Sequence, residues 1–261
     1  MKEFLCDSSS RLLELDGIEM QFGGVTALKC IHYMVPSGII QAVIGPNGAG
    51  KTTLFHCISG LLQPTSGRIV FNGREINNLS PHRIAALGIS RTFQHVALYK
   101  SMTVLENVMV GRHPRTNCGF WKAGLRLPGM MQEERRIRES ALGYLDFVGL
   151  AGEVNRWAGT LPLGKQKILE IARALATEPK LLLLDEPAGG LNMRETEELG
   201  ALIQNICRKG ITVVLIEHDM NLVMEISDRI LVLYYGQHLA TGAPHEIKKN
   251  AAVIDAYLGS E

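Results

Sequence analysis

The stretch GPNGAGKTTL, residues 45–54, decides the fold of this chain of 261 residues. It follows the apolar run IIQAVI at 39–44 and holds three glycines in the six residues before a lysine. A glycine-rich backbone is entropically costly, so the loop must allow something to come close to it. Gly45, Gly50, Lys51 and Thr52 match the pattern G-x-x-x-x-G-K-[ST], between an expected buried strand and an expected helix.

This pattern predicts a loop that binds nucleotide phosphates together with Mg²⁺. Without Cβ atoms the loop can wrap phosphates with its N–H groups, and the helix that follows adds its positive N-terminal end. Lys51 should then neutralise the β- and γ-phosphates, while the Thr52 hydroxyl holds Mg²⁺. The residues of this loop expected to bind ATP are Gly45, Pro46, Asn47, Gly48, Ala49, Gly50, Lys51, Thr52 and Thr53.

A second apolar run, LLLLDEP at 181–187, ends in two adjacent acids. Successive residues of a strand point in opposite directions, so Asp185 and Glu186 should have different tasks. Asp185 suits the Mg²⁺ shell, and Glu186 is free to polarise an attacking water. Two acids at a strand end are more often a solvated turn, but a phosphate-binding loop in the same chain favours the catalytic interpretation.

Strands and helices alternate in both end portions of the chain, with a helical stretch between them. Expected strands lie at 39–44, 67–73, 180–185 and 211–217, with one pair over 11–35 and another over 229–240. Expected helices lie at about 52–59, 165–176 and 194–209, around Ile137, and after Ser80, Thr103 and His218. The pattern is typical of an α/β domain with a helical insertion.

Composition excludes several classes of protein. The net charge is +1, which gives no support to a nucleic-acid binder that relies on a global basic field. Five scattered cysteines without a CxxC pair indicate reduced thiols rather than disulfides or a metal site. The apolar runs are too short to span a bilayer, and the N-terminus lacks the apolar region that export or a lipoprotein Cys6 would need. We therefore expect a cytoplasmic protein.

Together these motifs resemble the nucleotide-binding subunit of an ABC transporter, over essentially the whole chain. The resemblance implies an α/β fold: a P-loop NTPase core of ABC type with a mainly parallel sheet, an N-terminal antiparallel β part and an inserted helical subdomain. It implies one ABC ATP-binding domain over 1–261. Its expected parts are a nucleotide-binding core at 11–94 and 177–240, a helical subdomain with the signature at 95–176, and a C-terminal helical tail at 241–261.

The resemblance also implies roles for residues outside the phosphate-binding loop. Phe22, in QFGG, stands where the family places an aromatic ring against adenine. Gln94, in RTFQ, resembles the Q-loop glutamine that touches Mg²⁺ and the water and links the site to the membrane subunits. His218, in IEHD, resembles the switch histidine that contacts the γ-phosphate. The expected catalytic residues are Glu186, His218, Gln94 and Lys51, and the expected metal residues are Thr52, Gln94 and Asp185.

The segment LPLGKQKILEIARAL departs from the usual LSGGQ signature, which acts on the ATP of the opposing subunit. Pro162 replaces the serine and has neither hydroxyl nor N–H, so it should hold the partner's nucleotide with fewer hydrogen bonds. Asn192 replaces the aspartate found in many family members. Both variants resemble the branched-chain amino acid importer branch and suggest a heterodimer with two unequal sites. The expected trans-acting residues are Leu161, Pro162, Leu163, Gly164, Lys165, Gln166 and Asn192.

The segment 111–131 contains both apolar and basic residues, and its length resembles the same importer branch, as does DAYLG at 255–259. One interpretation is a loop with its own small apolar cluster. The other is a contact on the membrane-facing side, where cations favour anionic lipid and membrane subunits. The residues concerned are Phe120, Trp121, Leu125 and Leu127 with Arg112, Arg115, Lys122 and Arg126.

The resemblance implies an ATP-hydrolysing subunit of an ABC importer for branched-chain or hydrophobic amino acids, with ATP and Mg²⁺ as cofactors. Its partners would be two transmembrane permeases, a second ATPase subunit and a periplasmic or extracellular substrate-binding protein, with no nucleic acid. It would lie on the cytoplasmic face of the inner membrane, held there through the permeases.

Two other classes compete with this interpretation. One is the ATPase of another ABC system, for urea or amide import or for lipopolysaccharide export. The lipopolysaccharide ATPase has a shorter linker and an orthodox signature. The other is a soluble ABC ATPase acting on nucleic acid or ribosomes, which would carry a long coiled coil or two cassettes. No residue of such a subunit touches the transported molecule, so only the family branch indicates the substrate.

Overall fold

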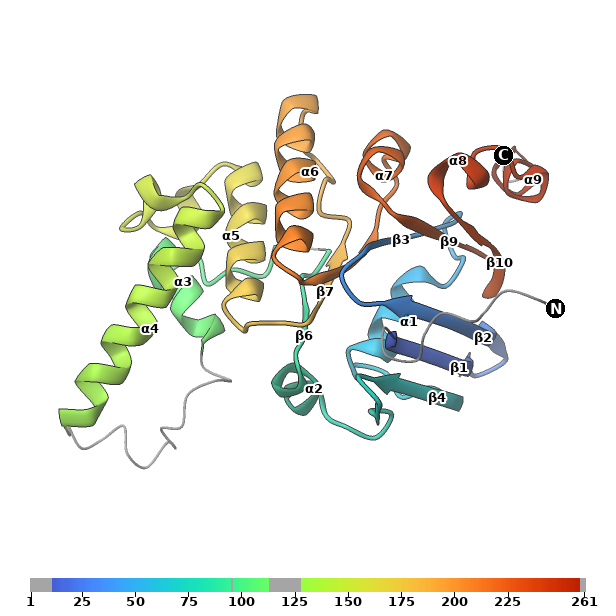
Figure 1. The fold of residues 1–261 in the computed structure, drawn as a ribbon, viewed down its shortest axis with the longest axis horizontal. Helices are drawn as coiled ribbons and strands as arrows, with labels where there is room; N and C mark the ends of the chain where they lie inside the picture. Colours follow the sequence, from blue (N-terminus) through green and yellow to red (C-terminus); the bar gives the residue numbers. More distant parts are fainter. Residues whose placement is uncertain (1–10, 95, 113–127, 259–261) are drawn as a thin grey trace.

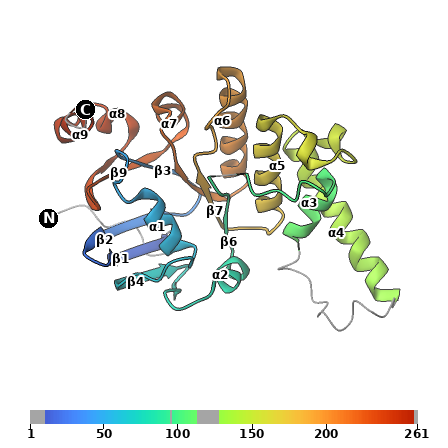
Figure 2. The same cartoon turned by 180° about the vertical axis from the view of Figure 1, so that it is seen from behind.

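The computed structural model describes residues 11–94, 96–112 and 128–258 (Figure 1). The expected segment 113–127, with Phe120 and Trp121, lies outside the described residues. Two sheets form the body of the molecule, and helices cover them, as the views from the front and from behind both show (Figures 1 and 2).

The larger sheet has six strands in the order β10-β9-β3-β8-β7-β6. All neighbouring strands are parallel except β10, which runs antiparallel to β9. The central strands β3, β7 and β8 are mostly apolar and buried along their whole length, because both faces of the sheet are covered. The strands are β3 (Ile40–Ile44), β6 (Ile89–Arg91), β7 (Leu181–Asp185), β8 (Thr212–Ile216), β9 (Arg229–Tyr234) and β10 (Gln237–Gly242).

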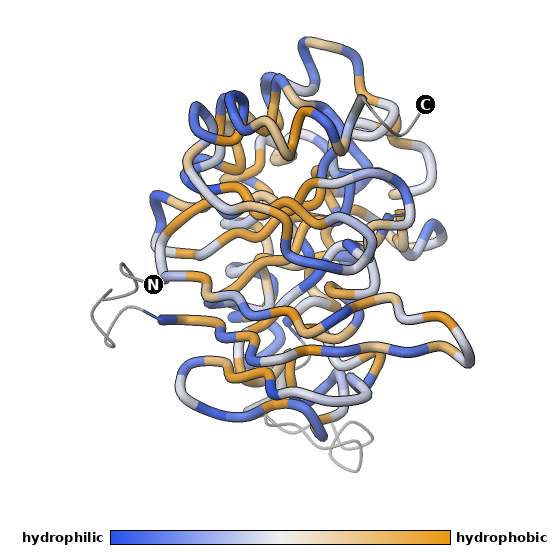
Figure 3. Tube along the Cα trace, turned by 90° about the vertical axis from the view of Figure 1, so that its right-hand side faces the viewer, coloured by the Kyte–Doolittle hydropathy of each residue, from blue (hydrophilic) through white to orange (hydrophobic). Residues whose placement is uncertain are grey.

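Strand β7 shows how one apolar run serves two cores. Leu181 and Leu183 belong to the core shared with the smaller sheet, while Leu182 and Leu184 belong to the core on the opposite face. This alternation follows from the two-residue period of a strand. Figure 3 shows the hydrophobic stretches of the trace running along the inner strands, with hydrophilic stretches mostly at the outer turns. The expected buried strands therefore lie at the centre of the fold.

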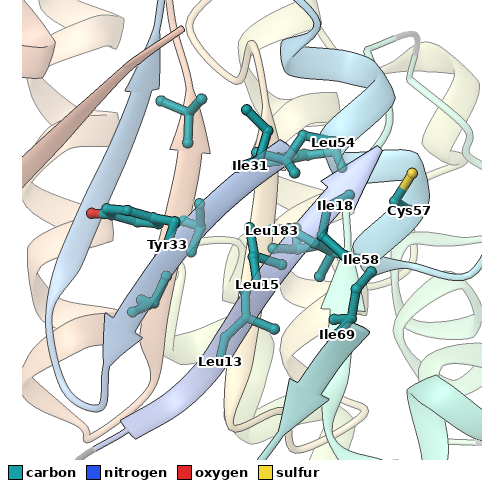
Figure 4. Close-up of a cluster of buried hydrophobic side chains, with 14 of the residues drawn as sticks. Leu13, Leu15, Ile18, Ile31, Tyr33, Leu54, Cys57, Ile58, Ile69 and Leu183 are labelled. Carbon is teal, nitrogen blue, oxygen red and sulfur yellow. The ribbon is translucent and has the colours of Figure 1, made fainter. Parts of the chain in front are cut away.

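The smaller sheet is antiparallel, in the order β2-β1-β4-β5, and packs over α1 (Lys51–Ile58). Figure 4 shows side chains such as Leu15, Ile18 and Leu54 meeting between this sheet and α1. The strands are β1 (Arg11–Phe22), β2 (Val25–Pro36), β4 (Ser66–Phe71) and β5 (Arg74–Glu75).

The expected strand over 67–73 is wrong at its end. Strand β4 stops at Phe71, and Asn72 and Gly73 form a turn with φ of 49° and 75°. Two successive left-handed residues of the type Asn-Gly suit a tight hairpin, which returns the chain into β5. The turn signal was present in the sequence as an Asn-Gly pair.

A third core lies among helices and draws its buried residues from Val104 to Ala176. It joins α3 (Val104–Gly111), α4 (Pro128–Phe147) and α5 (Leu163–Leu175). The expected capping box begins α3: Thr103 Oγ1 accepts from Glu106 N at 3.2 Å, and Glu106 Oε2 accepts from Thr103 N at 2.7 Å. This core falls inside the proposed helical subdomain at 95–176.

The remaining helices cover the sheets or end the chain. They are α2 (Pro81–Leu87), α6 (Met193–Arg208), α7 (Met220–Ile226), α8 (Pro244–Ile247) and α9 (Ala251–Leu258). Among the described residues, no helix is both long enough and apolar enough to span a bilayer. Cys30, Cys57 and Cys207 are free thiols, and the other two cysteines lie outside the described residues.

Candidate nucleotide site

The candidate residues gather at the edge of the larger sheet where its parallel strands end. Gly45 follows β3, Gln94 follows β6, Asp185 ends β7, and His218 follows β8 shortly after its last residue. Parallel strands present their carboxyl ends at one edge, and ligands of open α/β sheets bind there. The topology therefore brings together residues that are far apart in the sequence.

A cavity of about 260 Å³ lies at this edge. Its lining joins the phosphate-binding loop to residues from the other three strand ends. The lining residues are Ala27, Asn47, Gly48, Ala49, Gly50, Lys51, Thr52, Thr53, Gln94, Glu186 and His218. Gly45, Pro46, Asp185 and Phe22 are not in this lining.

Two glycines of the loop are required by space as well as by conformation. Gly45 has φ of 151°, and a Cβ there would lie 2.1 Å from the carbonyl oxygen of Leu233. Gly50 has φ of 101°, and its Cβ would lie 2.7 Å from the carbonyl oxygen of Ala27. Side chains at either position would push the loop away from the strands that support it.

Lys51 is the buried cation of the cavity, with 6% of its surface exposed. Its ammonium donates to the carbonyl oxygens of Gly45 at 2.6 Å and Pro46 at 3.0 Å. Burial lowers the pKa of Lys51, and the nearby carboxylates Glu186 and Asp185 oppose that shift. A cation with so little solvent gains strongly from an anionic ligand such as a phosphate.

Glu186 connects two of the other expected catalytic side chains, those of His218 and Gln94. Its Oε1 lies 2.7 Å from His218 Nε2, and its Oε2 accepts from Gln94 Nε2 at 3.1 Å. The carboxylate is therefore oriented by partners from two other strand ends. This is the arrangement expected of a group that must aim at one water molecule.

The separation of Asp185 and Glu186 has a second cause beyond strand alternation. Asp185 is the last residue of β7, and Glu186 adopts φ of 48°, in the left-handed region. That conformation is uncommon for a residue other than glycine and is found at functional sites. It turns the Glu186 side chain into the cavity, while Asp185 stays buried below it.

Asp185 pairs with Arg91, a residue that the sequence analysis did not single out. Arg91 Nη2 donates to Asp185 Oδ2 at 2.7 Å, and the two side chains are only 6% and 1% exposed. The guanidinium also lies over the rings of Phe55 and Phe93, at 5.7 and 5.6 Å from their centroids. Asp185 Oδ1 is buried without a hydrogen-bond partner in the structure, so an oxygen suited to a hard cation such as Mg²⁺ is available.

Arg91→Met should lower the free energy of unfolding by about 3 kcal/mol, because it leaves the Asp185 carboxylate buried without its partner cation. Methionine keeps most of the apolar contact with the two rings, so the loss reports mainly the charge. Urea denaturation followed by circular dichroism measures the free energy of unfolding. The control is Arg135→Met, which removes an exposed ion pair on α4. A loss below about 0.5 kcal/mol, the range of ordinary surface substitutions, would contradict a structural role for the pair.

Phe22 ends β1 with 46% of its surface exposed and lies outside the cavity lining. An exposed ring at the rim of a sheet is free to stack on a flat ligand. Its role against adenine stays a prediction.

The residues expected to form the signature do not line this cavity, and their action on another subunit's nucleotide stays a prediction. Pro162 is the residue before α5, with φ of −55°, and its side chain makes no capping hydrogen bond. Gln166 Nε2 donates to the Leu161 carbonyl at 2.7 Å, and Lys165 pairs with Glu153. Leu163 is 46% exposed. The N-terminus of α5 is thus held in shape without the serine hydroxyl.

Asn192 and Gly164 each lie close to Glu195, in the first turn of α6. Asn192 Oδ1 accepts from Glu195 N at 3.0 Å, and Glu195 Oε2 accepts from Asn192 N at 3.0 Å. A Cβ at Gly164 would lie 2.6 Å from Glu195 Oε1. Asn192 is therefore the N-cap of α6, a role that asparagine fills as well as aspartate.

The sequence analysis also missed three buried charged residues near the cavity: Lys167, Glu170 and Glu217. The signal for the first two was available, because both fall on the apolar face of a helical pattern, where a charge is unusual.

Comparison with known proteins found two family models that match this chain and relatives that are similar over nearly its whole length. A family model described as "ABC transporter" matches residues 28–189, and one described as "Branched-chain amino acid ATP-binding cassette transporter" matches residues 237–261. The chain is 47% identical over 252 residues to the high-affinity branched-chain amino acid transport ATP-binding protein BraF of Pseudomonas aeruginosa, covering 96% of this chain and 99% of that protein. It is 43% identical over 252 residues to the LivG protein of the same description from Escherichia coli K12, with the same coverage.

Solved structures resemble the fold closely. One is a nucleotide-free ATP-binding cassette from an ABC transporter, with a TM-score of 0.83 and 33% identity over 95% of this chain and 98% of that one. Another is the ADP conformation of such a cassette, with a TM-score of 0.84 and 32% identity over 96% and 99%. The fold class expected from the sequence is confirmed.

Proposed function

The chain belongs to the ABC transporter family of ATP-binding proteins, and we propose from this that it hydrolyses ATP to power uptake of branched-chain or other hydrophobic amino acids through partner permeases. The proposal of ATP hydrolysis rests on one observation: Lys51, Gln94, Glu186 and His218 line the same cavity. The proposal of amino acids as the transported substrate rests on the names of the relatives, which describe branched-chain amino acid transport. They favour amino acids over urea or amide import and over lipopolysaccharide export, and nothing among them favours a nucleic-acid or ribosome factor.

In this mechanism ATP binds with its phosphates in the loop 45–53. Thr52, Gln94 and Asp185 would hold Mg²⁺, which when bound would supply positive charge against the phosphates. Glu186 would polarise the attacking water, and Gln94 and His218 hold its carboxylate in place. His218 would also contact the γ-phosphate. The unpartnered Asp185 Oδ1 supports the metal assignment.

The permeases are proposed to dock beside Gln94, between the larger sheet and the helical core. A cavity of about 350 Å³ lies there, lined in part by Phe93, Tyr99 and Arg173. Phe93 and Tyr99 are large aromatic residues with 44% and 51% of their surfaces exposed. Exposed aromatic side chains around a hollow are typical of a protein interface. Docking here would hold the chain at the cytoplasmic face of the membrane and bring Gln94 under the permease.

The substrate assignment is tested by purifying the chain with its permeases and substrate-binding protein. Leucine, isoleucine or valine should stimulate ATP hydrolysis, whereas urea or short amides should not. Stimulation by urea alone would replace the amino-acid assignment while leaving the ATPase assignment intact.

Because Pro162 stands where the signature has serine, we predict a transporter with two unequal ATP sites. Serine at this position would donate a hydrogen bond to the partner's nucleotide, and one neutral hydrogen bond is worth about 0.5 to 1.5 kcal/mol. That is roughly a three- to tenfold change in rate at about 1.4 kcal/mol per decade. This chain should therefore dimerise poorly by itself on ATP and pair with a second ATPase subunit that has an orthodox signature.

The asymmetry is measured by disabling the loop lysine of each ATPase subunit in turn in the assembled transporter. Loss of Lys51 here should reduce hydrolysis more than loss of the partner's lysine, because the nucleotide on this chain faces the intact signature. Pro162→Ser should narrow the difference. Equal losses from both subunits, or a robust ATP-driven homodimer of this chain, would contradict the prediction.

A further inference from the structure

Three charged side chains lie buried directly behind the Glu186 loop. Lys167 and Glu170, both on α5, are 8% and 4% exposed, and Glu217, which follows β8, is 4% exposed. The proposed mechanism uses none of them. Charges are rarely buried unless they are paired and do something that apolar side chains cannot do.

Lys167 binds the main chain of the residue assigned as the catalytic base. Its Nζ donates to the carbonyl oxygen of Glu186 at 3.1 Å. Glu186 has a left-handed backbone, which costs about 1 kcal/mol or more and persists only when its surroundings hold it. Burial lowers the pKa of Lys167, and the carboxylates Glu217, Glu170 and Glu186 oppose this.

Glu217 and Glu170 hold the two loops on either side. Glu217 Oε1 accepts from Ala188 N at 2.6 Å, and its Oε2 accepts from His218 N at 3.0 Å. Glu170 Oε1 accepts from Phe93 N at 3.3 Å, next to Gln94. Each carboxylate therefore fixes the backbone of a loop that carries a side chain in contact with Glu186.

The cluster has no room for a ligand. The space between Lys167, Glu170, Asp185 and Glu186 is about 10 Å³, which is at most the volume that one water needs. Lys167 is packed closely between two loops and the turn at Glu186, so its ammonium interacts with protein groups and not with a ligand. Its contribution is therefore to position other groups.

We propose that Lys167 is a positioning residue that holds the turn at Glu186 and, with Glu170 and Glu217, fastens the signature helix α5 to the loops bearing Gln94 and His218. The inference rests on the proposed ATPase function. Lys167 lies on α5, five residues after Pro162, which precedes the helix. A shift of α5 when its N-terminus meets the partner's nucleotide would therefore move the Glu186 carbonyl as well. One ATP site is thereby linked to the other through this chain.

The test is Lys167→Met in the purified transport complex, because methionine keeps an unbranched apolar side chain, one heavy atom shorter, and removes the donor. Loss of a hydrogen bond from a charged donor should lower kcat by about 10- to 100-fold. The ATP dissociation constant should stay within about twofold, since Lys167 does not line the nucleotide cavity. Lys167→Arg, which keeps the charge and donors, should recover part of kcat. The matched control is Lys249→Met, an exposed lysine after α8 that should change neither quantity.

A double variant separates positioning from general destabilisation. In the Glu186→Gln background, Lys167→Met should cause little further loss in single-turnover hydrolysis, because the group it positions is already gone. An additive loss would overturn the proposal, as would unchanged kcat in the single variant of an active complex. If Lys167→Met fails to fold, Lys167→Gln, which is uncharged and one atom shorter than lysine, must show the same separation of kcat from ATP affinity. Failure of both variants to fold would assign Lys167 a purely structural role.

The outcome is distinguishable from failure of the proposed function. If Glu186→Gln hydrolyses ATP normally, the ATPase mechanism is wrong and the inference falls with it. If Glu186→Gln is inactive but Lys167→Met is not, only the inference is wrong.

Discussion

Glu186→Gln should abolish turnover at this chain's ATP site, while ATP still binds and traps a closed dimer with the second ATPase subunit. The substitution removes the carboxylate that polarises water, and general-base catalysis is worth at least about a hundredfold. The amide can still bond to both neighbours, because its oxygen accepts from Gln94 and its nitrogen reaches His218. The phosphate-binding loop is untouched, so the ground-state complex persists and only the chemical step is lost.

The measurement is single-turnover hydrolysis together with ATP affinity and size-exclusion chromatography in ATP. Glu197→Gln, an exposed acid on α6, is the matched control and should behave as wild type. Near-normal hydrolysis by folded Glu186→Gln would exclude Glu186 as the base. Hydrolysis lost together with ATP binding would instead indicate collapse of the loop.

Lys51→Ala should weaken nucleotide binding itself, by about a hundredfold or more. Its ammonium is buried and donates to two loop carbonyls, so its removal takes away both the charge opposite the phosphates and a support of the loop. Each hydrogen bond to a charged group is worth about 1.5 to 3 kcal/mol, and about 1.4 kcal/mol is a tenfold change in affinity. Unlike Glu186→Gln, this variant should also fail to form the ATP-dependent dimer.

Calorimetric titration with ATP tests this, with Lys249→Ala as a control for loss of an exposed lysine. Unchanged ATP affinity in Lys51→Ala would contradict the phosphate-binding role. A variant that binds ADP normally but ATP weakly would localise Lys51 to the γ-phosphate rather than to the loop as a whole.

The sequence by itself determined the features that depend on neighbouring residues. The phosphate-binding loop, the alternating leucines of β7 and the capping box at Thr103 each depend on residue types a few positions apart. Local backbone conformation and the direction of side chains follow directly from such spacing. The α/β fold class then follows from the order of the elements.

Only the tertiary structure decided which distant residues meet. Arg91 and Asp185 are 94 positions apart, and they pair because β6 lies next to β7 in the sheet. Lys167 reaches the Glu186 carbonyl because α5 packs under the turn that follows β7. Strand order and helix packing are global outcomes of burying apolar faces, and no short stretch encodes them.

For Glu186, some properties could be predicted from the sequence and others depend on the tertiary structure. Its type and its place after an apolar strand led to the prediction that it is the catalytic base. Its left-handed backbone and its contacts with His218 and Gln94 come from surrounding elements that hold a conformation the residue does not prefer locally. The residue types of the candidate site could therefore be predicted from the sequence, but the geometry that orients them depends on the assembled fold.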